Sequence, residues 1–303
     1  ALFYIRGLPN NFREKLIIAK SRFNGKYPFF ISIFTIIFIS IGGYIYYTNN
    51  ILNDRTSSKE REIETVEWEK KYKKYENYKQ PRIVSVNVDV NIYPKSRDVN
   101  ASGEYIMINK TTEAIDSIFL DHNSALSTFK FDKENSLVSE DTLYNFDIYK
   151  LKKPLFTGDT LKLSFTVKNK PNTLLRNNSS VIYNGTFLNS SYFPRLGYSG
   201  GELTDNKTRE KYDLPPNELK PHPSDSTALG NTYISKDADW IDFEATVSTS
   251  KDQIAIAPGY LQKEWVEGDR RYFHYKMDSK ILNFYAFNSA KYEVKKDKWN
   301  DVN

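Results

Sequence analysis

The chain has 303 residues, a formal net charge of +5 and no cysteine. The absence of cysteine excludes disulfides, thiolate nucleophiles and cysteine-ligated metal sites. The net charge is small and the charged residues are spread along the chain, so we expect no nucleic-acid partner. Aromatic residues make up 15% of the sequence and are mostly Tyr and Phe, which favours β-structure over a helical bundle.

Residues 1–27 form a basic segment with helical spacing. The basic residues are Arg6, Arg13, Lys15, Lys20, Arg22 and Lys26, against the single acid Glu14. The apolar residues Phe12, Leu16, Ala19 and Phe23 recur at spacings that place them on one face of a helix. A basic amphipathic helix of this kind lies on a membrane surface, or it is a solvated helix that packs on another part of a longer protein. The residues alone leave both interpretations open.

Residues 28–47 read PFFISIFTIIFISIGGYIYY and contain no charged side chain. At about 1.5 Å per residue, a helix of this length spans roughly 30 Å, the hydrocarbon thickness of a bilayer. We therefore predict a transmembrane helix over residues 28–48. A buried core helix is the alternative, but cores seldom need so long an apolar run. Basic residues exceed acidic ones before this run and not after it, so the positive-inside rule predicts a cytoplasmic N-terminus.

Residues 49–81 are predicted to form a charged helical stalk. Ser57 or Ser58 can cap the helix, and Pro81 ends it. Glu and Lys cover most of its surface, apart from a narrow aromatic stripe made of Trp68, Tyr72 and Tyr75. This pattern is typical of a stalk that touches a partner on one side.

From residue 83 the period of the sequence changes from that of a helix to that of a strand. Valines at alternate positions from Val84 to Val90 are separated by Ser, Asn and Asp, which predicts a long strand with one buried face. Further strands are predicted at 103–109, 114–123, 126–132, 143–151, 159–168, 239–249, 252–261, 270–277 and 282–294. A long loop with a short helical piece near 205–212 lies between the two groups. We therefore predict a mainly β fold, with the two helices followed by an antiparallel β-sandwich or saddle-like domain.

No catalytic constellation is visible in the sequence. A zinc hydrolase needs two His one helical turn apart with a carboxylate nearby. The three histidines, His122, His222 and His274, have no ligand-spaced partner. Glycine-rich phosphate loops and nucleophile elbows are also absent from the sequence. We therefore predict no catalytic residue and no metal ligand in this segment.

Four stretches carry a resemblance to a known family. They are residues 84–122, 190–198 (SSYFPRLGY), 240–265 and 270–294. Together they resemble the N-terminal β-domain of the aminopeptidase-N-like (gluzincin) zinc metallopeptidases. In that family the first stretch is an opening strand, Pro, loop and strand. The second contains an aromatic-Phe-Pro sequence, and the last two are the strands before the catalytic domain.

The order of span, charged stalk and β-domain is similar to a group of bacterial fusion proteins. In them an ABC-transporter-type permease region is followed by an aminopeptidase-like region outside the membrane. On this resemblance residues 1–53 hold the last permease span, and the chain is a fragment that ends before the catalytic domain. The resemblance implies a bacterial inner-membrane protein with most of the chain in the periplasm. Its implied partners are the lipid bilayer, and the remaining permease spans and catalytic domain of the same polypeptide.

The sequence departs from the family pattern in two respects. The H-E-x-x-H zinc helix and the G-x-M-E-N motif are absent, so the resemblance implies zinc in the full-length protein and no cofactor in this segment. The stretch SSYFPRLGYSGGE also lacks the acidic residue that the family places shortly after Phe-Pro. Family side chains shortly before that Pro reach the substrate, which by resemblance makes Asn184, Gly185 and Thr186 substrate-facing.

The resulting domain assignment is a cytoplasmic basic segment at 1–27, a transmembrane helix at 28–48, a stalk at 49–81, an extracytoplasmic β-domain at 82–295 and the start of a link to a further domain at 296–303. The first functional hypothesis is a membrane-anchored, non-catalytic β-domain that supports a zinc peptidase domain outside this chain. The full-length protein would then be a zinc metallo-aminopeptidase.

The second hypothesis is a scaffold that binds other subunits of a membrane complex, without peptidase activity. Its expected contacts are the stripe of Trp68, Tyr72 and Tyr75, together with Tyr192, Phe193 and Tyr198, which we expect to be exposed. A carbohydrate-binding sandwich is a third interpretation, for which the Tyr content is the only signal.

Overall fold

The structure is a computed structural model that describes residues 11–21, 23, 25–52, 57–122, 127–169, 179–198, 201–217, 222, 224–226 and 239–295. The chain divides into two compact units, residues 1–56 and 57–303. The expected link at 296–303, the basic residues Arg6 and Arg22, and much of the long loop lie outside the described residues.

The first unit contains α1 (Phe12–Ser21) and α2 (Tyr27–Asn50). Pro28 lies in the first turn of α2, where its missing N–H leaves no intrahelical bond unmade. The apolar side chains of α2 are exposed, and none of its most apolar window is buried in the protein. By length and composition α2 can cross a membrane, and a signal sequence near the N-terminus would pass the same test. The expected single apolar helix is therefore confirmed.

The second unit begins with α3 (Ser58–Tyr72), followed by a 3-10 turn, η1 (Lys73–Tyr75). Ser57 caps the helix: its hydroxyl accepts from the Glu60 backbone N–H, and the Glu60 carboxylate accepts from the Ser57 N–H. This reciprocal pair satisfies two backbone donors that a helix start leaves unpaired. Of the two serines named from the sequence, Ser57 is the cap.

The largest sheet has the strand order β12-β13-β10-β1-β2-β7-β4, with β14 paired to β10. Its strands are β1 (Arg82–Tyr93), β2 (Asp98–Ile108), β4 (Thr128–Phe131), β7 (Thr160–Asn169), β10 (Trp240–Ser250), β12 (Tyr260–Glu267), β13 (Arg270–Lys276) and β14 (Ile281–Leu282). In β1 the side chains of Val86, Val88 and Val90 are buried, whereas Asn87 and Asp89 between them are exposed. The predicted alternation is confirmed from Val86 onward. At the start of the strand the register shifts between Ile83 and Ser85, and Ile83 is buried while Val84 is half-buried.

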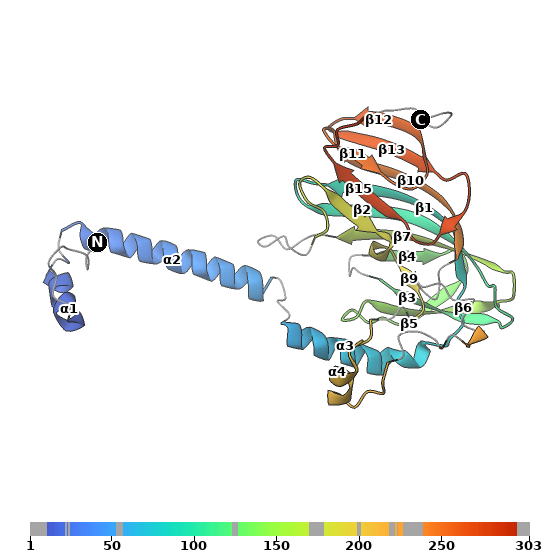
Figure 1. Cartoon of the computed structure of the whole chain (residues 1–303), viewed down its shortest axis with the longest axis horizontal. Coiled ribbons are helices and arrows are strands. Elements are labelled where there is room, and N and C mark those ends of the chain that lie inside the picture. The colour runs from blue at the N-terminus through green and yellow to red at the C-terminus, as the bar shows by residue number, and fades with distance from the viewer. Residues whose placement is uncertain are drawn as a thin grey trace. The chain divides into compact units, whose positions relative to one another are not determined.

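Two smaller sheets complete the unit. The three-stranded sheet has the order β11-β15-β8, and the four-stranded sheet has the order β5-β6-β3-β9. Their strands are β3 (Ile115–Asp121), β5 (Asn135–Ser139), β6 (Phe146–Leu155), β8 (Thr186–Asn189), β9 (Arg195–Leu196), β11 (Ile254–Ile256) and β15 (Ala286–Ala290). One apolar core joins residues of all three sheets. In Figure 1 the four-stranded sheet lies below the large sheet, and α3 runs along its other side with the short helix α4 (Asn206–Lys211).

The mainly β, sandwich-like fold is as expected. Strands β5, β8 and β9 were not predicted, and two further local differences have a clear physical reason. β1 pairs in parallel with β10, so the large sheet is mixed rather than purely antiparallel. The chain between these two strands is long enough to make such a crossover. The single strand predicted over 252–261 is two strands, because Gly259 interrupts it at φ 104°. A Cβ at Gly259 would lie 2.6 Å from the carbonyl carbon of Lys276, so only glycine fits.

Candidate functional site

The aromatic stripe of α3 packs on the four-stranded sheet of the same chain. Spacings of four and three place these side chains on one helix face. Trp68 stacks on Tyr198 with ring centroids 4.5 Å apart, and Tyr72 lies 4.4 Å from Phe146. Tyr75 lies 4.8 Å from Phe119 of β3. Tyr72, Phe119, Phe146 and Tyr198 form a second apolar cluster beside the main core.

A buried ion pair joins α3 to α4. The guanidinium of Arg209 donates to both oxygens of Glu69, at 2.8 Å and 2.7 Å, and each of the two residues is 1% exposed. Arg209 also donates to the backbone carbonyls of Leu203 and Pro215, at 2.9 Å and 2.6 Å. A buried charge is tolerated only when it is paired and its remaining groups are hydrogen-bonded, and both conditions hold here.

Two further carboxylates hold the same helix face. Glu202 accepts from the Lys73 ammonium at 2.8 Å and from the Tyr198 hydroxyl at 3.0 Å. Burial by itself would raise the pKa of Glu202, but these two hydrogen bonds outweigh it and lower the pKa. Asp141 accepts from Lys71 and from the Tyr72 hydroxyl.

The pKa of Asp141 is lowered in the same way, because these hydrogen bonds and one from the Tyr144 backbone N–H outweigh its burial. The pKa values of Tyr72 and Tyr198 move up, first because burial disfavours the phenolate and then because a carboxylate lies beside each hydroxyl. Near neutral pH the two carboxylates are therefore ionised and the two phenols neutral, and these hydrogen bonds hold α3 in place.

Several of the six aromatic residues expected to touch a partner are packed within this chain instead, and Tyr72 is one of them. Phe193 and Tyr198 are buried within this chain, so the expectation that they are exposed is wrong. Phe193 packs in the main core beside Phe287 and Tyr285, and Tyr198 lies under Trp68. Tyr192 is half-buried against the main core. Alternation could not reveal this, because Tyr192 ends the short turn η2 (Ser190–Tyr192), and Phe193 and Tyr198 lie outside regular strands, on either side of the two-residue strand β9.

The residues named as substrate-facing lie where the chain enters the three-stranded sheet: Asn184 and Gly185 directly precede β8, and Thr186 is its first residue. Asn184 and Gly185 are exposed, and the Asn184 side-chain oxygen accepts from the Lys291 backbone N–H at 2.8 Å. Thr186 is buried, and its hydroxyl donates to the Ile182 carbonyl at 3.1 Å. The assignment of a substrate-facing role to these residues stays a prediction.

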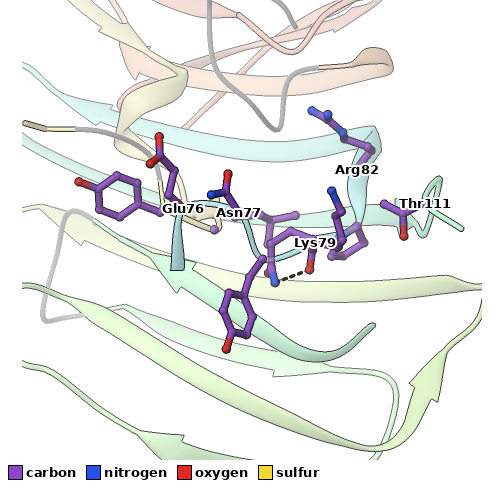
Figure 2. Close-up of a pocket in the computed structure, with 11 residues that line it drawn as sticks. Glu76, Asn77, Lys79, Arg82 and Thr111 are labelled. Carbon is purple, nitrogen blue, oxygen red and sulfur yellow. Dashed lines mark hydrogen bonds between the residues drawn. The ribbon is translucent and has the colours of Figure 1, made fainter. Parts of the chain in front are cut away.

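A pocket of about 260 Å³ lies where the chain passes from η1 into β1 (Figure 2). Figure 2 labels Glu76, Asn77, Lys79, Arg82 and Thr111 among its lining residues, so its charged groups have both signs. Gln80 holds this segment to β3: its amide donates to the Ser117 carbonyl, and its side-chain oxygen accepts from the Phe119 N–H, both at 2.9 Å. The pocket therefore lies along the junction that fixes α3.

The described residues do not include a group of three or more His, Asp or Glu placed to hold a metal ion. The zinc that the resemblance implies therefore has no ligand set in this part of the chain. His274 lies in β13, and its Nε2 is 2.8 Å from a Glu244 oxygen. His122 directly follows β3, and its Nε2 is 3.4 Å from an Asp147 oxygen. Each of these two histidines thus contacts a carboxylate of a neighbouring strand.

The Glu69–Arg209 pair was not found by sequence reasoning. The two residues are 140 positions apart, and each lies in a segment where other charged residues surround it. No local pattern distinguishes Glu69 from the neighbouring Glu and Lys residues of α3. Glu69 differs from these residues only in the folded domain, where the packing of α3 buries it beside Arg209.

No protein-family model matches the sequence, and the comparison with curated proteins found no match. A solved structure of an M1 zinc metallopeptidase from Deinococcus radiodurans aligns at 12% identity and a TM-score of 0.42, over 69% of this chain and 42% of the peptidase chain. A mutant of that peptidase bound to a Tyr-Ser-Ala substrate aligns at 13% identity and a TM-score of 0.41, over the same shares. The aligned part thus spans less than half of the peptidase. Similarity at this level does not establish membership of a family.

Proposed function

We propose that residues 82–295 form the non-catalytic β-domain of an aminopeptidase-like protein, anchored in a membrane through α2. The domain braces a zinc peptidase domain that lies outside this chain. The sequence resemblance supports this proposal, and the mainly β fold agrees with it. The peptidase activity and the zinc belong to the proposed full-length protein.

The observation that carries the bracing role is the outer side of the three-stranded sheet. The register aligns Ile256, Asn288 and Phe187 in one row across the three strands. Phe187 is 50% exposed and Ile256 40% exposed, and the exposed ring of Tyr183 lies close by in sequence. Exposed apolar side chains on two strands of one small sheet, here on either side of Asn288, are typical of a surface that another protein surface covers. Asn184 and Gly185 lie at the same edge, where a substrate-facing loop would meet the second domain.

The anchoring role is supported by α2 and α3 together. α2 has the length and composition of a membrane span. α3, the next helix along the chain, is integrated in the β-domain through the Glu69–Arg209 pair and the aromatic cluster. We propose that the N-terminus is cytoplasmic and that the β-domain lies in the periplasm of a bacterium, since the basic residues precede the span. A permease region fused before the span remains part of this proposal.

The test is made on the full-length protein purified in detergent, beside this chain alone. We expect zinc and aminopeptidase turnover in the full-length protein and neither in this chain. The double variant Phe187→Ser/Ile256→Ser should lower turnover on the order of 100-fold, because misplacement of a bracing domain disturbs the active geometry. The matched control is Leu137→Ser/Val138→Ser, an exposed apolar pair on β5, which should leave turnover unchanged.

The alternative is a scaffold for a membrane complex, and strand β12 favours it. β12 is an edge strand of the large sheet, with Tyr260, Leu261 and Val266 exposed. Edge strands offer unpaired backbone groups to which a partner strand can add. If the full-length protein contains neither zinc nor turnover, the peptidase proposal fails and this alternative takes its place.

A further inference from the structure

Helix α1 exposes a set of large apolar side chains to its surroundings. Phe12 is 71% exposed and Leu16 45% exposed, and Phe23 just after the helix is also exposed. Within the helix, Phe12, Leu16 and the buried Ala19 follow one face. Water is an unfavourable environment for so many large apolar groups on so short a helix.

Basic side chains border this apolar face. At 100° per residue, Arg13 and Lys20 flank the apolar face on one side and Lys15 flanks it on the other. Glu14, the single acid of the helix, and Ser21 lie on the opposite face, where Ile17, 63% exposed, and the half-buried Ile18 flank them. Long basic side chains beside an apolar stripe can place their stems along the stripe and their charges above it. This arrangement complements a surface that is apolar below and negatively charged above.

The chain continuity determines which surface is available. Only five residues separate the last residue of α1, Ser21, from the first residue of α2, Tyr27. At most about 3.6 Å per residue, this connection reaches roughly 20 Å. If α2 spans a bilayer, α1 therefore lies within reach of the headgroup region on the side where α2 begins.

We propose that α1 lies in the plane of an anionic lipid surface, with Phe12 and Leu16 inserted at the boundary of headgroups and acyl chains. Arg13, Lys15 and Lys20 contact the negatively charged headgroups. The inference rests on the proposed membrane anchoring through α2, and it adds a lipid selectivity that a simple apolar span does not have. In-plane amphipathic helices of this type bury their apolar face about 5–10 Å below the headgroup level.

The chain has no cysteine, so single-cysteine variants can be labelled at one position each. Three variants carry an environment-sensitive fluorophore: Leu16→Cys on the apolar face, Glu14→Cys on the opposite face and Ile39→Cys within α2. The full chain is reconstituted in phosphatidylcholine vesicles with and without phosphatidylglycerol, and quenching by brominated lipids is measured. The Ile39 label reports the anchor alone, so a failure of the span is seen separately from a failure of the α1 proposal.

In vesicles with phosphatidylglycerol we expect strong quenching of the label at position 16 and little at position 14. In pure phosphatidylcholine vesicles we expect weaker quenching at position 16. Equal quenching in both lipids would overturn the proposed selectivity. Absence of quenching at position 16, with position 39 quenched, would overturn the in-plane position and favour a protein surface as the occupant of this face.

The charge contribution is tested with Lys15→Gln/Lys20→Gln. Each basic residue near an anionic surface contributes about fivefold to surface binding, so the inserted population should fall on the order of 25-fold relative to the free one. The control Lys152→Gln/Lys280→Gln removes the same charge from two exposed ion pairs of the β-domain and should change nothing. An equal loss in both variants would show that net charge, rather than α1, is responsible.

Discussion

Helices α2 and α3 follow each other in the chain and relate to their surroundings in opposite ways. α2 is built mainly from Phe, Ile and Tyr, and most of these large side chains are exposed. α3 is built mainly from Glu and Lys, and yet Val66, Glu69 and Tyr72 are buried. The apolar helix thus leaves its large side chains exposed, whereas the charged helix is packed on its own domain.

The difference shows that hydropathy alone does not identify which helix belongs to a protein core. An apolar helix with exposed side chains requires a solvent other than water, and a bilayer supplies it. A charged helix can be held tightly when a few of its charged side chains form ion pairs with the domain and one narrow face carries packed aromatic rings. Glu69 with Arg209, Glu202 with Lys73 and the Tyr72 ring supply these contacts for α3.

The largest expected effect is the loss of the buried ion pair. Arg209→Met leaves the Glu69 carboxylate buried without its partner, which costs about 3–5 kcal/mol in the free energy of unfolding. Urea unfolding followed by tryptophan fluorescence measures this, because Trp68 reports the position of α3. If α3 is an independent stalk, this variant should unfold at the same urea concentration as the parent protein.

The double variant Glu69→Met/Arg209→Met is the matched control for this prediction. Two apolar side chains of similar length leave no unpaired charge, so much of the lost stability should return. A double variant as unstable as Arg209→Met would mean that the arginine acts through its bonds to Leu203 and Pro215 instead.

The second effect concerns α2 and its need for a bilayer. Ile37→Asp places a carboxylate near the middle of the helix, which costs about 2.5–3.5 kcal/mol for insertion into a membrane. We expect a smaller fraction of the chain in the membrane pellet after alkaline extraction. Val138→Asp, at an exposed position of β5, is the control and should remain in the pellet. Equal extraction of both variants would contradict a spanning role for α2.

The third effect is a pH dependence of the α3 contacts. The pKa values of Asp141 and Glu202 are lowered from their ordinary values of 3.8 and 4.5, so both carboxylates stabilise the folded state above those values. This stabilisation should disappear as the pH falls through the lowered pKa values. The resulting loss of stability should be smaller than the loss in Arg209→Met, because a protonated carboxyl still forms hydrogen bonds.

The urea midpoint at neutral and acid pH measures this dependence. The double variant Asp141→Asn/Glu202→Gln should show a flatter profile than the parent protein over the acid range. Parallel profiles in the two proteins would mean that other carboxyl groups cause the acid sensitivity.

The smallest effect is expected at the start of α3. Ser57→Ala removes the side-chain cap and should cost about 1 kcal/mol in the free energy of unfolding. Lys26, which precedes α2, makes no side-chain cap, so Lys26→Ala should have no comparable effect on helix content. A loss of helical circular dichroism in both variants, or in neither, would contradict the prediction that only α3 depends on a side-chain cap.

Local patterns in the sequence were sufficient for the elements whose determinants are local. The apolar run that became α2, the Ser57 cap of α3 and the alternating valines of β1 each act within a few residues. Their helical and strand periods follow from backbone geometry, so the sequence predicts them directly. The division of one strand at Gly259 was missed, because its cause is the close approach of the Lys276 backbone from another strand.

The sequence by itself therefore determined the mainly β fold, the apolar helix and the charged helix. The tertiary structure decided what the charged helix contacts. The stripe of Trp68, Tyr72 and Tyr75 was visible in the sequence, but its partners Tyr198, Phe146 and Phe119 come from three distant segments. Pairing over such separations depends on how the sheets bring segments together, and no local period carries that information.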